Sequence, residues 1–168
     1  MSNVILIGFM GCGKSTIGKR LSYVLRKPFL DTDKMIERKE DMTISELFDR
    51  KGEGYFRDME TACIKELMED SGEYVIAVGG GLVLREENRR LLAKLGEVVY
   101  LRATADTIYE RLKKDNTRPL LQGENPQEKI RTMMAQRSDI YEDAARFVVD
   151  VDGKEFEEIL KEIGEKLS

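Results

Sequence analysis

The chain has 168 residues, of which 36% are charged and 41% are hydrophobic, and this length and composition are typical of one soluble, ordered domain. It contains no histidine, which excludes a Ser-His-Asp triad and any histidine metal ligand, and its two cysteines are too few for a four-thiolate zinc site or a disulfide framework. A net charge of −4 and the lack of a long apolar stretch argue against a nucleic-acid or membrane partner, so we expect a cytoplasmic protein whose oxygen atoms hold any metal.

Short apolar segments alternate with longer amphipathic ones, a pattern typical of βαβ units that build a parallel sheet. Apolar residues at helical spacing predict helices over Lys14–Leu25 and about 154–167, which would cover the sheet. We therefore expect a single domain over residues 1–168 with an α/β fold, in which three layers (α/β/α) contain a five-stranded parallel sheet. The predicted strands are Val4–Ile7, Pro28–Leu30, Tyr74–Val78, Val98–Leu101 and Phe147–Val151.

The stretch between the second and third predicted strands interrupts this alternation. Asp31–Glu73 has helical patterning but no strand, and Thr43 and Glu46 have the spacing of a helix capping box. This stretch is too long for one crossover helix. We therefore expect a small helical region, at about residues 32–60, over one end of the sheet.

A second interruption lies at residues 116–125, a polar segment that contains proline and glycine. Pro126 then follows at a position typical of the first residue of a helix. Loops of this kind often close over active sites, so the sequence predicts a lid at about residues 112–125.

The segment from Gly8 to Ser15, GFMGCGKS, matches the phosphate-loop pattern G-x-x-x-x-G-K-[ST]. It follows a predicted strand and precedes a predicted helix, which is the context that this motif requires. The glycines let backbone N–H groups converge on an anion, and the helix adds the positive end of its dipole. Lys14 can reach the β- and γ-phosphates and Ser15 can ligate Mg²⁺. The alternative is an incidental glycine-rich turn.

The residues that follow the second strand are candidates for metal and acceptor binding. The sequence lacks the Asn-Lys-x-Asp motif that reads guanine, which favours ATP, and no acidic residue ends the third strand. Asp31 and Asp33 lie at the edge of the sheet where open α/β folds bind ligands. One carboxylate could face Mg²⁺ and the other an acceptor hydroxyl. Helix capping is the alternative role, and the two roles are compatible.

Three further features could contribute to a site. Gly79–Gly81 would permit a ligand to approach the backbone closely, or could form a plain turn. Arg57 stands three residues before Glu60, a spacing that also suits an ordinary ion pair on a helix surface. Arg137 is equally ambiguous when taken alone. We interpret the two cysteines as small filler residues without chemistry.

Taken together, the order and spacing of these motifs resemble those of the shikimate kinase family over nearly the whole chain. The resemblance implies a P-loop kinase fold of the nucleoside-monophosphate-kinase type, with a helical substrate-binding region and a lid. It also implies transfer of the γ-phosphate of ATP to the 3-hydroxyl of shikimate, on the route to chorismate and the aromatic amino acids. Val78 departs from the family, in which Ser or Thr commonly precedes the three glycines. The matching motifs are residues 8–16, 31–33, 52–57 with Glu60, 79–81, 118–121, Arg137 and Tyr141.

The resemblance also implies roles for individual residues. Asp33 would contact the acceptor hydroxyl, while Asp31 would support Mg²⁺ through water beside its ligand Ser15. Lys14 and Arg118, the second carried by the lid, would act with Asp33 on the transferring phosphate. The implied nucleotide-binding residues are Gly11, Cys12, Gly13, Lys14, Ser15, Thr16, Arg111, Arg118 and Asp152. The implied shikimate-binding residues are Asp33, Arg57, Glu60, Gly79, Gly80, Gly81 and Arg137.

This hypothesis gives ATP, Mg²⁺ and shikimate as partners and a monomeric protein. The nearest alternative is another small-molecule kinase of the same fold, such as gluconate kinase or a nucleoside-monophosphate kinase. The paired Arg57 and Arg137 favour shikimate, because planar guanidinium groups bind carboxylates strongly. An alternative of another class is a non-catalytic nucleotide-binding regulatory domain. The two aspartates beside the phosphate loop argue against it, since a switch needs no acceptor site.

Overall fold

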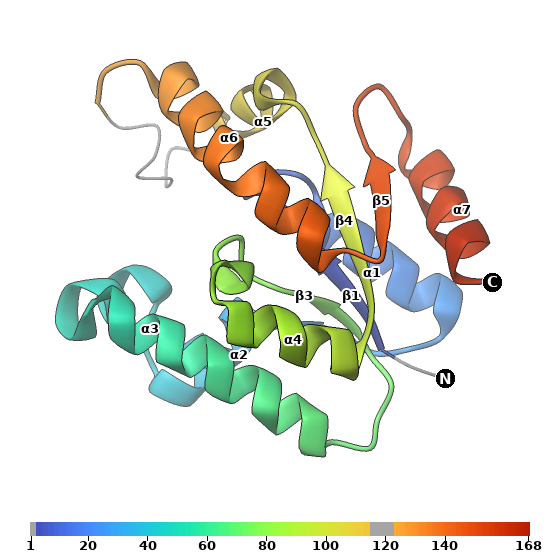
Figure 1. Cartoon of the computed structure of the whole chain (residues 1–168), viewed down its shortest axis with the longest axis horizontal. Coiled ribbons are helices and arrows are strands. Elements are labelled where there is room, and N and C mark those ends of the chain that lie inside the picture. Colours follow the sequence, from blue (N-terminus) through green and yellow to red (C-terminus); the bar gives the residue numbers. More distant parts are fainter. Residues whose placement is uncertain (1–2, 115–122) are drawn as a thin grey trace.

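The structure is a computed structural model that describes residues 3–114 and 123–168. Its centre is a five-stranded parallel sheet with the order β2-β3-β1-β4-β5 (Figure 1). The strands are β1 (Asn3–Ile7), β2 (Phe29–Asp31), β3 (Val75–Ala77), β4 (Gly96–Arg102) and β5 (Phe147–Asp150). Each predicted strand is present and ends within two residues of its predicted bounds, so the expected α/β fold with a parallel sheet is confirmed.

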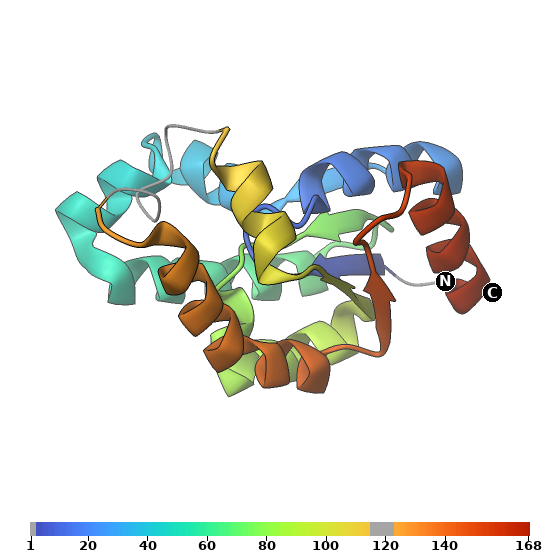
Figure 2. The same cartoon turned by 90° about the horizontal axis from the view of Figure 1, so that it is seen from above.

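Helices cover both faces of the sheet and complete the three expected layers. Figure 2 shows α1 and α7 on one face, and α4 and α6 on the other. A short 3-10 turn, η1 (Leu82–Leu84), follows β3 and precedes α4. The helices are α1 (Lys14–Leu25), α2 (Thr32–Glu40), α3 (Ile44–Glu69), α4 (Glu86–Leu95), α5 (Ala105–Leu112), α6 (Pro126–Ala144) and α7 (Phe156–Leu167).

The central strand β1 and its two neighbours determine where the sheet can position a site. Its residues are all buried, as expected for a parallel strand that is covered on both faces. Its one polar member, Asn3, donates from Nδ2 to Leu95 O at 3.0 Å and accepts from Tyr74 N at 2.7 Å. Because β3 and β4 run parallel to β1, the loops that follow the three strands meet at one edge of the sheet.

Two helices without an intervening strand, α2 and α3, occupy the stretch between β2 and β3, as the sequence predicts. Thr43 caps α3 by accepting a hydrogen bond from Glu46 N at 3.1 Å. Helix α3 is interrupted at Gly52, whose φ of 84° and ψ of 167° are not helical. The segment from Gly52 onward carries Arg57 and Glu60 back toward the sheet.

Helix α6 begins with Pro126 in its first turn, which confirms that prediction. The predicted lid at 112–125 falls largely on residues 115–122, which lie outside the described residues, and Arg118 lies among them. Within residues 3–114 and 123–168, no helix combines the length and the apolar character needed to span a bilayer.

Helix α1 approaches the sheet very closely at Gly18. A Cβ atom built on this residue would lie 2.4 Å from Cε1 of Phe29 in β2, which is closer than real side-chain atoms approach. Glycine is unfavourable inside a helix. It is present here because the gap between α1 and β2 leaves no room for a side chain.

Gly18→Ala is expected to lower the free energy of unfolding by about 1–3 kcal/mol, because the added methyl group overpacks the contact with Phe29. Gly164→Ala in α7 is the matched control, since a Cβ there has no atom within 4 Å. It should raise stability by about 0.5–1 kcal/mol through helix preference alone. Urea denaturation measures both changes. A stabilised Gly18→Ala protein would contradict the close packing of α1 on Phe29.

Candidate active site

A cavity of about 570 Å³ opens at the carboxyl ends of β1, β2 and β3. The loop after β1 forms one side of it, and the residues that follow β2 and β3 form the other. The lining residues are Met10, Gly11, Gly13, Lys14, Ser15, Thr16, Asp31, Asp33, Lys34, Glu37, Ile44, Ala77, Val78, Gly79 and Gly80. The cavity therefore brings Lys14 and Ser15 of the phosphate loop together with Asp31, Asp33, Gly79 and Gly80, whereas the predicted site residues Arg57, Glu60, Gly81, Arg111, Arg137 and Asp152 are not among its lining residues.

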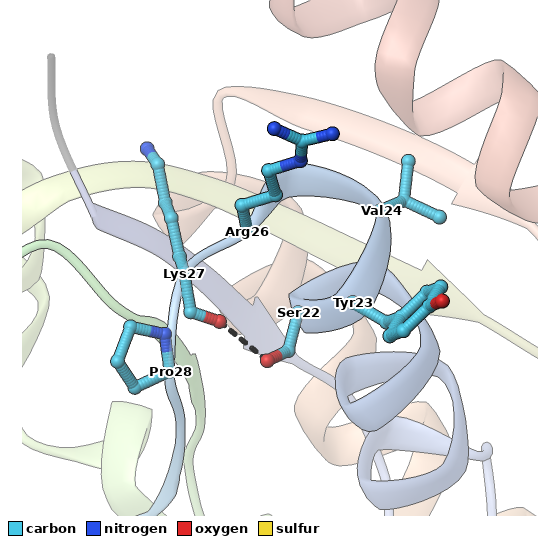
Figure 3. Close-up of a pocket in the computed structure, with 6 residues that line it drawn as sticks. All are labelled: Ser22, Tyr23, Val24, Arg26, Lys27 and Pro28. Atoms are coloured by element: carbon cyan, nitrogen blue, oxygen red, sulfur yellow. Dashed lines mark hydrogen bonds between the residues drawn. The ribbon is translucent and has the colours of Figure 1, made fainter.

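A second hollow of about 610 Å³ lies at the other end of α1, away from the phosphate loop. Figure 3 shows its residues around the end of the helix, with the side chains of Arg26, Tyr23 and Val24 pointing in different directions. The drawn hydrogen bond, from the Ser22 hydroxyl to the carbonyl of Lys27, only closes the turn. The first cavity is the better candidate for chemistry, because it gathers charged side chains from the segments that follow β1 and β2.

The loop after β1 has the geometry of an anion-binding site. Gly11 and Gly13 have φ values of 83° and 101°, a region that favours glycine. Gly13 is the N-cap of α1, and none of the described side chains caps this end. The first backbone N–H groups of α1 therefore remain available to a phosphate at the cavity.

The charged side chains around this loop come from two elements. Lys14 Nζ lies within the loop and donates to Gly8 O at 2.5 Å and to Phe9 O at 3.2 Å. Arg111 of α5 donates from Nη1 to Gly11 O at 3.2 Å, so it lies beside the loop. Cys12 is fully buried beneath the loop, which agrees with a filler role.

Asp152 makes a contact that the sequence does not predict. Its two carboxylate oxygens accept from the backbone N of Thr104 at 3.1 and 3.2 Å. This contact joins the turn after β5 to the turn before α5. Asp152 thus holds the turn before α5, and any contact with a nucleotide would be added to that role.

Asp31 faces the phosphate loop and caps a helix at the same time. Its Oδ1 accepts from Asp33 N at 2.9 Å and from Lys34 N at 3.4 Å, at the start of α2. Its Oδ2 lies 3.5 Å from Ser15 Oγ. The capping and metal roles are therefore compatible, because each uses a different oxygen.

The oxygens of Ser15 and Asp31 suit Mg²⁺, which binds hard oxygen ligands. The described residues contain no group of three or more acidic, cysteine or histidine side chains that could enclose a metal. A Mg²⁺ ion at this position would therefore depend largely on water and substrate phosphates, which is usual for this ion.

Two buried carboxylates face each other across Gly79. Asp33 Oδ1 and Glu60 Oε2 are buried and have no hydrogen-bond partner in the described part of the chain. A Cβ atom on Gly79 would lie 2.7 Å from the first oxygen and 3.2 Å from the second. Burial raises the pKa of Asp33, and the carboxylate of Asp31 adds to that shift. Burial also raises the pKa of Glu60, to about 7.

Arg57 lies against the same loop. Its Nη1 donates to Glu60 Oε1 at 2.7 Å, and only 17% of the Arg57 side chain and none of the Glu60 side chain is exposed. A Cβ atom on Gly81 would lie 2.6 Å from both Nη1 and Nη2, so the guanidinium group packs directly on this glycine. The alternative of an ordinary surface ion pair is therefore wrong: the pair is buried.

Helix α6 brings Arg137 and Tyr141 to the site from the opposite side. The Arg137 guanidinium lies 5.7 Å from the centre of the Phe9 ring. The Tyr141 hydroxyl donates to Gly80 O at 2.6 Å. Tyr141 and Thr32 both belong to matching sequence motifs that indicate no role for them, and the Thr32 hydroxyl accepts from Gly79 N at 3.2 Å. Both contacts span distant parts of the chain and leave no periodic pattern.

Comparison with known proteins agrees with this geometry. A family model described as shikimate kinase matches residues 10–168. The chain belongs to the shikimate kinase family. The shikimate kinase of Thermodesulfovibrio yellowstonii is 45% identical over 163 residues, which are 97% of this chain and 93% of that protein.

Solved structures of family members extend the comparison to the fold. Shikimate kinase from Acinetobacter baumannii, in complex with shikimate, is 35% identical and has a TM-score of 0.92, over 99% of this chain and 93% of that chain. Shikimate kinase from Aquifex aeolicus is 37% identical with a TM-score of 0.85, over 98% and 95% of the two chains. A gluconokinase from Sinorhizobium meliloti, 16% identical with a TM-score of 0.55, shares the fold alone.

Glu60 gives this family member a measurable pH dependence. Between its ordinary pKa of 4.5 and its native pKa of about 7, Glu60 keeps a proton in the folded protein that the unfolded chain has released. The free energy of unfolding should therefore fall as pH rises from 5 to 7, and Asp33, whose pKa is also raised, contributes with the same sign. Urea denaturation of Glu60→Gln should show a weaker fall. Parallel pH profiles for the two proteins would contradict the raised pKa.

Proposed function

We propose that the chain transfers the γ-phosphate of ATP to the 3-hydroxyl of shikimate through the cavity after β1, β2 and β3. Membership of the shikimate kinase family supports this function over gluconate kinase or a nucleoside-monophosphate kinase. The observation that carries it is the meeting of Arg57, Glu60 and Asp33 at Gly79–Gly81, beside the phosphate loop. A regulatory nucleotide-binding domain would have no use for this second group of residues.

The loop after β1 would bind the phosphates of ATP. The N–H groups at the start of α1 supply donors, and the helix dipole favours the negative charge. Lys14 Nζ now binds two carbonyl oxygens of its own loop, and an oxygen of the γ-phosphate would be a stronger partner for its positive charge. Phosphoryl transfer depends mainly on such positioning and charge stabilisation. Gly11, Cys12, Gly13, Ser15, Thr16, Arg111 and Asp152 complete the proposed nucleotide-binding set.

Asp33 would receive the acceptor hydroxyl. Its Oδ1 is buried and has no hydrogen-bond partner among residues 3–114 and 123–168, and a hydroxyl group of the substrate would supply a donor. A carboxylate of raised pKa is also a better proton acceptor than an ordinary aspartate. We therefore assign to Asp33 the orientation of the hydroxyl and the acceptance of its proton.

The two guanidinium groups would hold the carboxylate of shikimate. Arg57 approaches from α3 and Arg137 from α6, on opposite sides of the glycine loop. Such groups form bidentate hydrogen bonds with carboxylates. Gly79–Gly81 carry no side chains, so the ring of the substrate would lie close to this backbone.

Ser15 and Asp31 would hold the Mg²⁺ ion that accompanies ATP. When bound, this ion supplies positive charge that neutralises the phosphates. The ion would use Oδ2 of Asp31, whereas Oδ1 caps α2. Arg118, which lies outside the described residues, is proposed to reach the transferring phosphate from the lid. We also propose that the protein is cytoplasmic and monomeric.

Purified protein with Mg²⁺ and ATP is expected to release ADP in the presence of shikimate, but not in the presence of gluconate or nucleoside monophosphates. Lys14→Met should lower kcat by about 100-fold or more, because it removes a charge that stabilises the transferring phosphate. A coupled ADP assay measures both results. Turnover with gluconate or a nucleotide, and none with shikimate, would refute the proposed function.

Asp33→Asn and Asp31→Asn should separate the two carboxylate roles. Asp33→Asn is expected to reduce kcat far more than ATP affinity, because the amide cannot accept the hydroxyl proton. Asp31→Asn keeps the helix cap, since asparagine is an equally good N-cap, and its defect should be partly restored by higher Mg²⁺ concentration. Kinetics over a range of Mg²⁺ concentrations test both. The opposite Mg²⁺ dependence would exchange the assignments.

A further inference from the structure

Side chains from three elements hold the backbone of the loop after β3. Thr32 of α2 accepts from Gly79 N at 3.2 Å, and Tyr141 of α6 donates to Gly80 O at 2.6 Å. Asn88 of α4 donates from Nδ2 to Leu82 O at 2.8 Å. Leu82 directly follows Gly81, the residue on which the Arg57 guanidinium packs. The position of this loop is therefore fixed by distant contacts.

Asn88 also holds the helix that carries Arg57. Its Oδ1 accepts from the Thr61 hydroxyl at 2.7 Å, and Thr61 lies one helical turn after Arg57 on α3. The Thr61 hydroxyl lies 3.2 Å from the carbonyl oxygen of Arg57, and it also accepts from Arg85 Nη1 at 3.3 Å. Asn88 is completely buried, and both ends of its amide are used.

We propose that Asn88 is a positioning residue for shikimate binding: one amide fixes both the loop that contains Gly81 and the turn of α3 that carries Arg57. The inference rests on the proposed function, because it assigns the Arg57 guanidinium to the substrate carboxylate. A bidentate contact is sensitive to orientation, so a small shift of α3 relative to Gly81 weakens it. Asn88 acts through Arg57 and touches no substrate itself.

Two ion pairs near this contact are unsuited to this role. Asp58 pairs with Arg85 at 2.9 Å and Lys65 pairs with Glu87 at 3.2 Å, but these pairs are exposed. Exposed ion pairs contribute little and tolerate movement. A buried amide whose partners have no water available imposes a defined geometry, because each lost hydrogen bond leaves an unsatisfied polar group.

The test compares two buried asparagines. Asn88→Ala should raise the KM for shikimate and the calorimetric Kd for shikimate by about tenfold, with the KM for ATP unchanged. Asn3→Ala is the matched control. Asn3 also bridges two backbone groups, Leu95 O and Tyr74 N, but it lies at the opposite end of the sheet. Its loss should lower the melting temperature and leave the KM for shikimate unchanged.

Thr61 supplies a second test that does not depend on the folding of Asn88→Ala. Thr61→Val removes the hydroxyl at nearly constant volume and should raise the KM for shikimate, whereas Thr61→Ser keeps the hydroxyl and should restore the normal value. All assays are made at a temperature where circular dichroism shows each variant to be folded.

The proposal is overturned if folded Asn88→Ala, or Thr61→Val where the former does not fold, has the wild-type KM for shikimate. It is equally overturned if Asn3→Ala raises that KM as much, because the effect would then be general loosening of the fold. Failure of the wild-type protein to phosphorylate shikimate would instead reject the proposed function, so the two failures are distinguishable.

Discussion

The buried ion pair of Arg57 and Glu60 is the contact on which the acceptor end of the cavity depends. Removing a carboxylate from water is unfavourable, and in the described part of the chain Oε1 of Glu60 gains a charged partner while Oε2 does not. The other oxygen shares a buried space with Asp33 Oδ1 across Gly79. When Glu60 is ionised, Arg57 compensates its charge, and Oε2 of Glu60 and Oδ1 of Asp33 are then acceptors that a ligand rich in hydroxyl groups can satisfy.

Sheet order explains why this acceptor end lies beside the phosphate loop. Strand β3 is hydrogen-bonded to β1 on one side and to β2 on the other, so the loops after the three strands are neighbours. The loop after β1 offers N–H groups and Lys14, while β2 delivers Asp31 and Asp33. Phosphoryl transfer needs a donor and an acceptor held in line, and the parallel sheet provides this proximity without a dedicated scaffold.

The features that the sequence predicts well are local ones. The strands, the glycine-rich loop before α1 and the N-terminus of α6 each follow from neighbouring residues. The sequence also shows the three-residue spacing between Arg57 and Glu60. It does not show that this pair is buried, because the covering residues come from distant segments. The contacts of Asp152 with Thr104 and of Tyr141 with Gly80 join residues 48 and 61 positions apart. Neither hydrophobic periodicity nor capping preference predicts contacts between residues so far apart in the sequence.

The two oxygens of Asp31 connect the two halves of the cavity, which are the phosphate loop and the acceptor residues. One oxygen faces Ser15, and the other holds the first turn of α2, in which Asp33 lies. A ligand that pulls Oδ2 toward the phosphate loop must therefore also strain the hydrogen bond between Oδ1 and Asp33 N. Binding at one substrate site would therefore change the binding free energy at the other. Thermodynamic linkage requires these two changes to be equal. We therefore expect the phosphate and acceptor halves of the cavity to be coupled through this single carboxylate.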